Sequence, residues 1–299
     1  MQRVVITGGT GVIGSHLSNQ LAMAGWHVVH LTRGENRGGK YQSFRWDPSN
    51  GYCDQDAIRE GDAIIHLAGS NIGEGRWTKA RRREIISSRT VTGELLHRIT
   101  VGSGIIPSVF ITASGINYYG SEISESIFTE SDPPSGDFLG ETCRLWEAAA
   151  DRFAGAGVRT VKLRTAVVLA SSGSALNRIT APTRAGLVVR LGPGNQYFPW
   201  IHIDDLCSVY HMSLEDSAMS GPYNAVAPQH VTHDMLMREV ARQKGLPLFL
   251  PHVPAWLLRA FLGDMSQLLT TGSRVSAERL SAAGFQFRYP DISSALRAC

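Results

Sequence analysis

The stretch VVITGGTGVIGSHL, residues 4–17, decides the fold class. It places Gly8, Gly11 and Gly14 at regular spacing between a short apolar strand pattern and a helix pattern. The first glycine permits a tight turn, the second lets a pyrophosphate approach the backbone, and the third lets the helix pack closely on the strand. The N-terminus of the helix then offers amides and a favourable dipole to phosphate groups. We therefore expect a dinucleotide site, with Thr10, Val12 and Ile13 also in contact with the cofactor, rather than a strand–helix turn that binds nothing.

Apolar strand patterns alternate with helix patterns through the N-terminal half of the chain. The expected strands are 3–7, 27–32, 42–46, 62–68, 107–113 and 158–169, and the expected helices are 12–24, 79–100 and 142–156. Such alternation predicts an α/β fold, a doubly wound parallel (Rossmann) sheet covered by helices on both faces. The alternation stops after about Ala170. We therefore expect a Rossmann domain at 1–169 and a smaller substrate-side domain at 170–299, which can return strands to the Rossmann sheet.

The bulk composition is typical of an ordinary globular protein. Of the 299 residues, 43% are apolar and 18% are charged, which supports a sizeable core and argues against disorder. The net charge is +3 and no basic face recurs along the chain, so we expect no nucleic-acid partner. Four widely spaced cysteines, without a Cys/His cluster, indicate reduced thiols, no metal site and a cytoplasmic location. No apolar run is long enough to span a membrane, and the immediate start of the first strand leaves no room for a signal peptide.

The end of the second expected strand decides between NAD and NADP. An acidic side chain there would bind the adenosine ribose hydroxyls. The sequence instead reads HLTRG at 30–34, with Thr32 and Arg33 at this position and Arg37 and Lys40 close behind. A guanidinium can hold a 2′-phosphate through two parallel hydrogen bonds. Solvated loop charges are the alternative, but the distance from the glycine turn favours NADP(H).

Further motifs carry a resemblance to a known superfamily. The chain has TGGTGVIG, HLAG at 66–69, TASGINYYG at 112–120 and LRTAVVL at 163–169. It resembles the extended short-chain dehydrogenases/reductases, the group that contains nucleotide-sugar epimerases and dehydratases. RWT at 76–78, ISSRTVTGELL at 86–96, CRLWEAAA at 143–150 and FPWIHIDDL at 198–206 are similar to one branch, the "epimerase family" proteins. Some members of that branch are labelled cell-division inhibitors of SulA type.

The resemblance implies further cofactor contacts. Leu67, Ala68 and Gly69 would line the cofactor after the fourth strand, and Glu84 and Arg89 on the next helix would face its pocket. Most arginines of that helix are typical of a solvated basic face, whereas Arg89 lies beside apolar residues. Many relatives dimerise through the helices that flank the fifth strand, so the resemblance also implies a homodimer.

The chemistry of the superfamily depends on a Tyr-x-x-x-Lys pair, and this chain lacks it. The tyrosine position holds Leu139 and the lysine position holds Cys143. There is no lysine between Lys79 and Lys162, so no shifted copy of the pair exists nearby. A tyrosine without a cation keeps a pKa near about 10 and is a poor acid–base group at neutral pH.

Several residues are nevertheless candidates for catalysis. Ser114 could orient a carbonyl or cap a turn. Tyr118 or Tyr119 could donate a proton or only pack over the cofactor. His202 could be a general acid/base or a hydrogen-bonded structural histidine. Cys143 could be a nucleophile or a small apolar filler beside the nicotinamide.

Polar side chains of the second half are expected at the mouth of the site. They are Gln196, Trp200, His202, Asp204 and Asn224. Two functions remain open. The first is an NADP(H)-dependent oxidoreductase with atypical catalytic residues, acting on an unknown small carbonyl or hydroxyl substrate, with epimerisation as a special case. The second is a catalytically inactive NADP(H)-binding regulatory or sensor protein.

Overall fold

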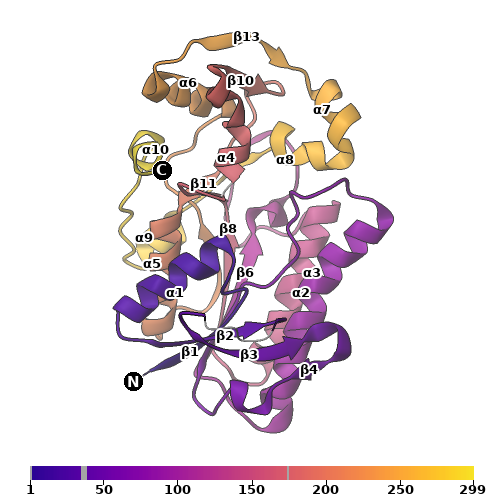
Figure 1. The fold of residues 1–299 in the computed structure, drawn as a ribbon, viewed down its shortest axis with the longest axis vertical. Helices are drawn as coiled ribbons and strands as arrows, with labels where there is room; N and C mark the ends of the chain where they lie inside the picture. The colour runs from indigo at the N-terminus through magenta and orange to yellow at the C-terminus, as the bar shows by residue number, and fades with distance from the viewer. Residues whose placement is uncertain (1, 35–38, 174) are drawn as a thin grey trace.

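A central β-sheet organises the computed structural model, which describes residues 2–34, 39–173 and 175–299 (Figure 1). Within these residues the sheet has eight strands in the order β12-β8-β6-β5-β1-β2-β3-β4. The strands are β1 Arg3–Thr7, β2 His27–Thr32, β3 Gln42–Asp47, β4 Tyr52–Cys53, β5 Ala63–His66, β6 Val109–Gly115, β8 Thr160–Thr165 and β12 Gly221–Ala225. All neighbours pair in parallel except β3 and β4. The order reverses at β1, and this reversal opens the crevice in which such sheets bind ligands.

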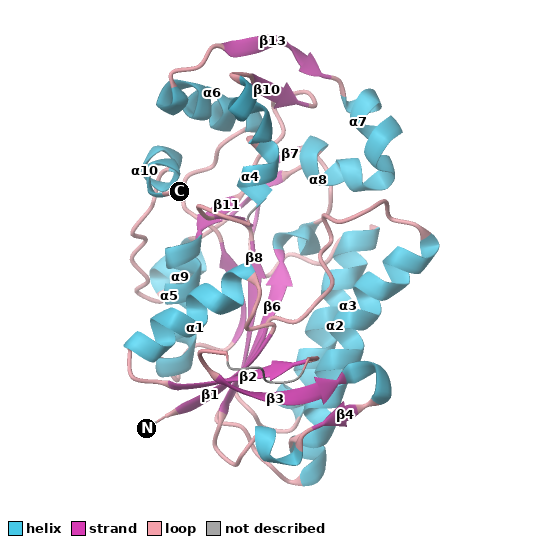
Figure 2. Cartoon of the chain, viewed as in Figure 1, coloured by secondary structure: helices cyan, strands magenta, loops and turns pink. Residues whose placement is uncertain are grey.

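Helices cover both faces of the sheet, as the alternating pattern predicts. Helices α1 Val12–Met23 and α5 Ile203–Glu215 pack together on one face, and α2 Lys79–Ile99 and α3 Phe138–Gly155 cover the other (Figure 2). The apolar side chains of Leu17 and Leu21 from α1 and of Leu95 and Leu96 from α2 are buried against the strands. The predicted doubly wound sheet is therefore confirmed.

The expected strand 158–169 is wrong in one respect, because the structure divides it into two strands. Strand β8 stays in the central sheet, whereas β9 Val167–Leu169 leaves it and pairs with β11 Trp200–His202. The break falls at Ala166, whose N–H donates to the carbonyl of Ala225 in β12 at 3.1 Å. The next N–H, that of Val167, donates to the Pro199 carbonyl at 3.1 Å, so the chain leaves the central sheet between these two residues.

The predicted start of α3 at Thr142 is also corrected. The helix begins at Phe138 because the Asp137 carboxylate accepts a hydrogen bond from the Gly140 N–H at 2.7 Å. Such an N-cap satisfies a backbone donor that has no partner inside the helix.

The second half of the chain contributes both to the central sheet and to a separate layer above it (Figure 1). Strand β12 pairs with β8, and α5 packs on α1. The remaining helices are α4 Ala175–Ile179, α6 His233–Lys244, α7 Ala255–Leu262, α8 Gln267–Thr270, α9 Glu278–Ala282 and α10 Ile292–Ala298. Two further strand pairs lie outside the central sheet: β10 Val188–Leu191 pairs with β13 Leu248–Val253, and β14 Ser273–Val275 pairs with β7 Ser124–Phe128 from the first half of the chain. The domain division at residue 169 stays a prediction.

Within the described ranges, no helix has the length and apolar character that a membrane crossing requires.

Candidate cofactor and substrate site

The glycine turn joins β1 to α1 at the open crevice. The Gly11 N–H donates to the Gly8 carbonyl at 3.0 Å, and Gly8 has a φ of +70° that disfavours any side chain. A Cβ on Gly14 would lie 2.2 Å from the Gly8 oxygen. Helix and turn therefore pack too closely for any residue but glycine at position 14, and the first turn of α1 faces the crevice.

Thr7 connects this turn with the HLAG segment at the end of β5. Its hydroxyl oxygen accepts hydrogen bonds from the N–H groups of Leu67 and Ala68, both at 3.1 Å, and lies 2.7 Å from His66 Nδ1. The other ring nitrogen of His66 lies 3.1 Å from the Thr92 hydroxyl on α2. Burial lowers the pKa of His66 to about 4, so its ring is neutral at pH 7. The segment after β5 is thus held by a buried, uncharged network.

Thr32 and Arg33 lie at the carboxyl end of β2, where the sequence predicts the adenosine phosphate. The Thr32 hydroxyl donates to the Gly34 carbonyl at 2.9 Å, and the Arg33 side chain is exposed. Arg37 lies outside the described residues. Arg33 is therefore available to a ligand from solvent.

Glu84 lies on the Arg33 side of the crevice and does not line the cavity described below. Hydrogen bonds from Arg81 and Ser70, together with the weaker influence of the Arg33 charge, hold the pKa of the Glu84 carboxyl below its ordinary value. The expectation that Glu84 faces the cofactor pocket stays a prediction.

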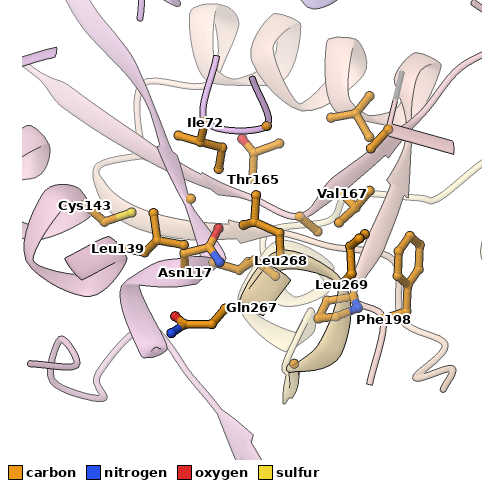
Figure 3. A pocket seen from close by; sticks show the side chains of 18 of the residues that line it. Ile72, Asn117, Leu139, Cys143, Thr165, Val167, Phe198, Gln267, Leu268 and Leu269 are labelled. Atoms are coloured by element: carbon orange, nitrogen blue, oxygen red, sulfur yellow. The ribbon is translucent and has the colours of Figure 1, made fainter. Parts of the chain in front are cut away.

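A cavity of about 710 Å³ extends from the glycine turn into the second half of the chain (Figure 3). Val12, Ile13 and Leu67 line it on the side of the turn. Ser114 at the end of β6 and Cys143 on α3 line its middle. The far wall comes from the loop before β11 and from 262–269, around α8. The cavity therefore joins the dinucleotide crevice to a second compartment.

A buried polar network lies beneath Ser114. The Ser114 hydroxyl donates to Glu147 Oε1 at 2.8 Å, and Arg164 binds the same carboxylate through Nε at 2.8 Å and Nη2 at 3.0 Å. Burial alone would lower the pKa of Arg164, but its bonds to Glu147 and its interaction with Tyr119 outweigh burial and raise it. The sequence reasoning missed both charged residues. A signal existed, since Arg164 interrupts an apolar strand and Glu147 stands among buried residues of α3.

The same network engages the hydroxyl of Tyr119. Tyr119 lines the cavity, but its oxygen accepts from Arg164 Nη1 at 2.8 Å and its proton is donated to Asn224 Oδ1 at 2.7 Å. Burial raises the pKa of Tyr119 to about 12. Tyr118 does not line the cavity; its ring lies against the Arg164 guanidinium, 3.5 Å from ring centre to Cζ. Neither tyrosine is therefore placed as a ready proton donor, and packing over the cofactor stays a prediction for Tyr119 alone, since Tyr118 packs on Arg164 outside the cavity.

Arg89 supplies the buried positive charge of the site. It lines the cavity and donates to the carbonyls of Ile85 at 2.9 Å and Ser70 at 3.1 Å. Its guanidinium lies 4.8 Å from the centre of the Trp146 ring, a cation–π contact. Burial lowers the pKa of Arg89 to about 10, so it remains charged at neutral pH.

The positions of the missing Tyr-x-x-x-Lys pair both face the cavity. Leu139 and Cys143 line it on one side, as Figure 3 shows. Burial, reinforced by the Glu147 charge, raises the pKa of the Cys143 thiol to about 12, which favours the apolar filler over the nucleophile. Arg144 is exposed and pairs with Glu141 at 2.7 Å, so it does not replace the lysine.

The structure places His202 away from the cavity. It caps the N-terminus of α5, where Nδ1 accepts from the Asp204 N–H at 3.2 Å, and its ring lies 3.9 Å from that of Tyr289. Burial lowers its pKa. These contacts favour the structural alternative. The other four side chains expected at the mouth, Gln196, Trp200, Asp204 and Asn224, also do not line the cavity, so that expectation is wrong.

Three amide side chains that the sequence reasoning overlooked line the cavity instead, and one of them, Asn71, is hydrogen-bonded to Glu74 and to the Gly73 N–H. Asn117 belongs to the turn just after Ser114, and Gln267 begins α8 (Figure 3). Among the described residues, neither the Asn117 nor the Gln267 side-chain amide has a hydrogen-bond partner. Asn117 stood in the TASGINYYG stretch but has no motif of its own, and Gln267 lies in a segment without any motif.

Comparisons with known proteins agree with a Rossmann protein of this type. The model of the NAD dependent epimerase/dehydratase family matches residues 4–226, and a domain of unknown function (DUF1731) matches residues 253–299. The epimerase family protein YfhF of Bacillus subtilis is 32% identical over 98% of this chain and 96% of its own length. The mouse epimerase family protein SDR39U1 is also 32% identical, over 99% of this chain and 98% of its own length.

The chain therefore belongs to the NAD dependent epimerase/dehydratase family, as the resemblance implied. A crystal structure of the human epimerase family protein SDR39U1 with NADPH superposes with a TM-score of 0.89. It shares 31% sequence identity with this chain, and the alignment covers 99% of this chain and 98% of the human one. The cell-division label finds no support in these comparisons.

Proposed function

We propose that this chain binds NADP(H) and transfers hydride between it and a small carbonyl or hydroxyl compound. The observation that carries the proposal is one continuous cavity that joins the glycine turn to Ser114 and then extends beyond it. A protein that only binds a dinucleotide needs the first compartment but not the second. The human relative with NADPH supports the choice of cofactor.

The residues present fit a dinucleotide. The turn around Gly14 leaves no room for a Cβ, and the amides of the first turn of α1 are available to a pyrophosphate. Exposed Arg33 would hold the 2′-phosphate. Arg89 would place its buried charge beside the nicotinamide ribose, in the role of the missing lysine.

NADPH supplies a hydride when it is bound, and the chain's own groups would position the partner. Ser114, held by Glu147, would bind the substrate oxygen. Since the hydroxyl of Tyr119 is engaged on both sides, we propose that the proton comes from water that enters the cavity. Such a site favours simple reduction or oxidation over epimerisation, which needs efficient proton transfer in both directions.

The test begins with fluorescence titrations of the purified chain with NADPH and with NADH. Arg33→Ala should weaken NADPH binding about tenfold and leave NADH binding unchanged, because a hydrogen bond to a charged group contributes about 1.5 kcal/mol. Arg83→Ala, an exposed arginine on α2 outside the cavity, is the matched control. Equal affinities for both cofactors, unaffected by Arg33→Ala, would contradict the cofactor assignment.

A second candidate function is an NADP(H)-dependent sensor without turnover. The observation in its favour is the absence, among the described cavity residues, of a tyrosine hydroxyl free to donate a proton. A panel of carbonyl compounds added to the NADPH complex separates the two functions. Loss of NADPH absorbance with a product formed in equal amount supports the oxidoreductase, and tight binding without oxidation of any compound supports the sensor.

We also propose the homodimer that the family resemblance implies, formed through α2 and α3. Val91 on α2 is 41% exposed, which leaves apolar surface on this helix pair. Light scattering on the wild type and on Val91→Arg tests it. A dimer mass that falls to the monomer in the variant supports the proposal, and a monomeric wild type rejects it.

A further inference from the structure

The compartment beyond Ser114 has apolar walls. Its side chains come from four separate segments, and we call it the apolar chamber: Ile72, Val167, Phe198, Leu268 and Leu269. Figure 3 shows Phe198, Leu268 and Leu269 across the cavity from Cys143. Residues from both halves of the chain therefore combine to build one apolar surface that faces the reacting end of the site.

Charged side chains are scarce around this cavity. Among the described residues that line it, only Arg89 and Arg178 carry a charge. Arg89 lies at the cofactor end, with its guanidinium close to Gly69 and Trp146. Arg178 is 58% exposed and already interacts with the Gly73 carbonyl at 2.8 Å and with Glu74 at 3.4 Å.

A nucleoside diphosphate does not fit this distribution of charge. Its two phosphates need several cationic or N–H donors, and a buried charge without such partners is very costly. Arg89 would be occupied by the cofactor, and Arg178 is a solvated residue at the rim that Glu74 neutralises. The chamber therefore disfavours nucleotide sugars and any phosphorylated compound.

The other polar side chains that line the cavity are uncharged. The amides of Asn117 and Gln267 line the cavity, and no described residue takes up their donors or acceptors. A mostly apolar pocket with a few polar groups that fix orientation is typical of small-molecule sites. An uncharged oxygen can bind at Ser114 and Asn117 while hydrocarbon fills the chamber.

From these observations we infer that the substrate is an uncharged apolar ketone, aldehyde or alcohol with a hydrocarbon tail that occupies the apolar chamber. The inference rests on the proposed function, since it assigns the substrate class of that same site. Reduction would add the hydride of NADPH to the carbonyl carbon and a proton from water to its oxygen, which yields the alcohol, NADP⁺ and a hydroxide ion that solvent neutralises.

Calorimetric titration of the chain saturated with NADP⁺ tests the inference without any turnover. The probes are 2-butanone, 2-hexanone and 2-octanone, with 5-oxohexanoate as a charged counterpart of 2-hexanone and UDP-glucose as the nucleotide sugar. Each methylene should tighten binding by up to about fourfold, which corresponds to about 0.8 kcal/mol. The carboxylate should weaken binding at least tenfold, and UDP-glucose should not displace 2-octanone.

A substitution in the wall of the apolar chamber gives a second test of the dependence of affinity on chain length. Leu268→Gln should reduce the gain per methylene by at least half, whereas Leu187→Gln, an exposed leucine outside the cavity, should leave it unchanged. Leu268→Ala replaces Leu268→Gln if the latter does not fold, and the wild-type series is decisive without either. An affinity that does not rise with chain length, or UDP-glucose that binds more tightly than 2-octanone, overturns the inference.

The inference and the proposed function can fail separately. Ketones that bind with the expected dependence on chain length but never oxidise NADPH would reject hydride transfer and leave the ligand class standing. Turnover of a nucleotide sugar with oxidation of NADPH would reject the apolar ligand class and leave hydride transfer standing.

Discussion

The buried pair of Glu147 and Arg164 offers the sharpest test of the structure. Both side chains are at most 5% exposed, and the carboxylate accepts two bonds from Arg164 and one from Ser114. Glu147→Gln keeps the size of the side chain but removes its charge, so Arg164 is left buried without a counter-ion. The loss of one partner of a buried pair costs about 3–5 kcal/mol. That is a large part of a typical stability of about 5–15 kcal/mol.

Urea unfolding and thermal unfolding at pH 7, both followed by tryptophan fluorescence, measure this loss of free energy and the resulting shift in Tm. For a chain of this size a change of 1 kcal/mol shifts the Tm by about 2 °C or somewhat more, so the expected decrease is roughly 5–15 °C. Glu141→Gln is the matched control, because Glu141 lies on the same helix and also binds an arginine, Arg144, but in solvent. Its unfolding midpoint should stay within experimental error of the wild type.

Two results would refute the reasoning about this pair. One is an equal loss of stability in Glu147→Gln and Glu141→Gln, which would mean that burial of the charge does not matter. The other is a double variant, Glu147→Gln with Arg164→Met, that is no more stable than Glu147→Gln alone. Removal of the unpaired Arg164 guanidinium should recover part of the lost free energy of unfolding, since apolar replacement of a buried pair is often tolerated.

Two further predictions concern the glycine turn and the response to pH. Gly14→Ala should weaken NADPH binding more than tenfold in a fluorescence titration, because its Cβ would lie 2.2 Å from the Gly8 oxygen and force helix and turn apart; unchanged affinity would contradict the close packing. Burial lowers the pKa of His233 to about 4, below an unfolded value of about 6.5, so its contribution to stability is complete above pH 6.5 and is lost as the pH falls toward 4. From pH 7 to pH 5 the wild type should therefore lose about 1–2 kcal/mol more than His233→Phe in urea unfolding, while exposed His27→Gln should follow the wild type.

The fold could be predicted from the sequence because its signals are local. The glycines of 8–14 and the alternation of apolar strands with helices fix the parallel sheet. Local signals do not show where a strand bends out of a sheet. The pattern 158–169 reads as one strand, and only the change of hydrogen-bond acceptor, from Ala225 of β12 for the Ala166 N–H to Pro199 for the Val167 N–H, shows that β8 ends before β9 begins.

The polar network of the site depended on strand register, which the sequence does not display. Ser114 of β6 and Arg164 of β8 are paired positions in neighbouring parallel strands, and Glu147 reaches both from α3. Neither the pairing nor the direction of the Tyr119 hydroxyl follows from spacing along the chain. Spacing placed two tyrosines near Ser114, but the turn at 116–119 directs one hydroxyl into the network beneath the cavity.

The expected mouth was wrong for a related reason. Trp200 and Asn224 lie in strands that pair with β9 and β8, and both are fully buried. The wall opposite Cys143 comes instead from apolar residues near α8, where no polar motif attracts attention. An apolar wall gives no signal in a search for catalytic groups, although it decides which ligand can enter.

The buried polar network beneath Ser114 and the apolar wall near α8 change how the missing Tyr-x-x-x-Lys pair is interpreted. Leu139 and Cys143 stand where a hydroxyl and an ammonium group would stand, and both line the cavity beside Ser114. They extend the apolar surface of the chamber as far as the cofactor side, while Glu147 and Arg164 still hold Ser114 in place from below. Under the proposed function, the site would lack the groups that move protons and keep Ser114 to bind an oxygen. Such a combination suits an apolar substrate that needs orientation and a hydride more than it suits a sugar whose hydroxyls must be ionised.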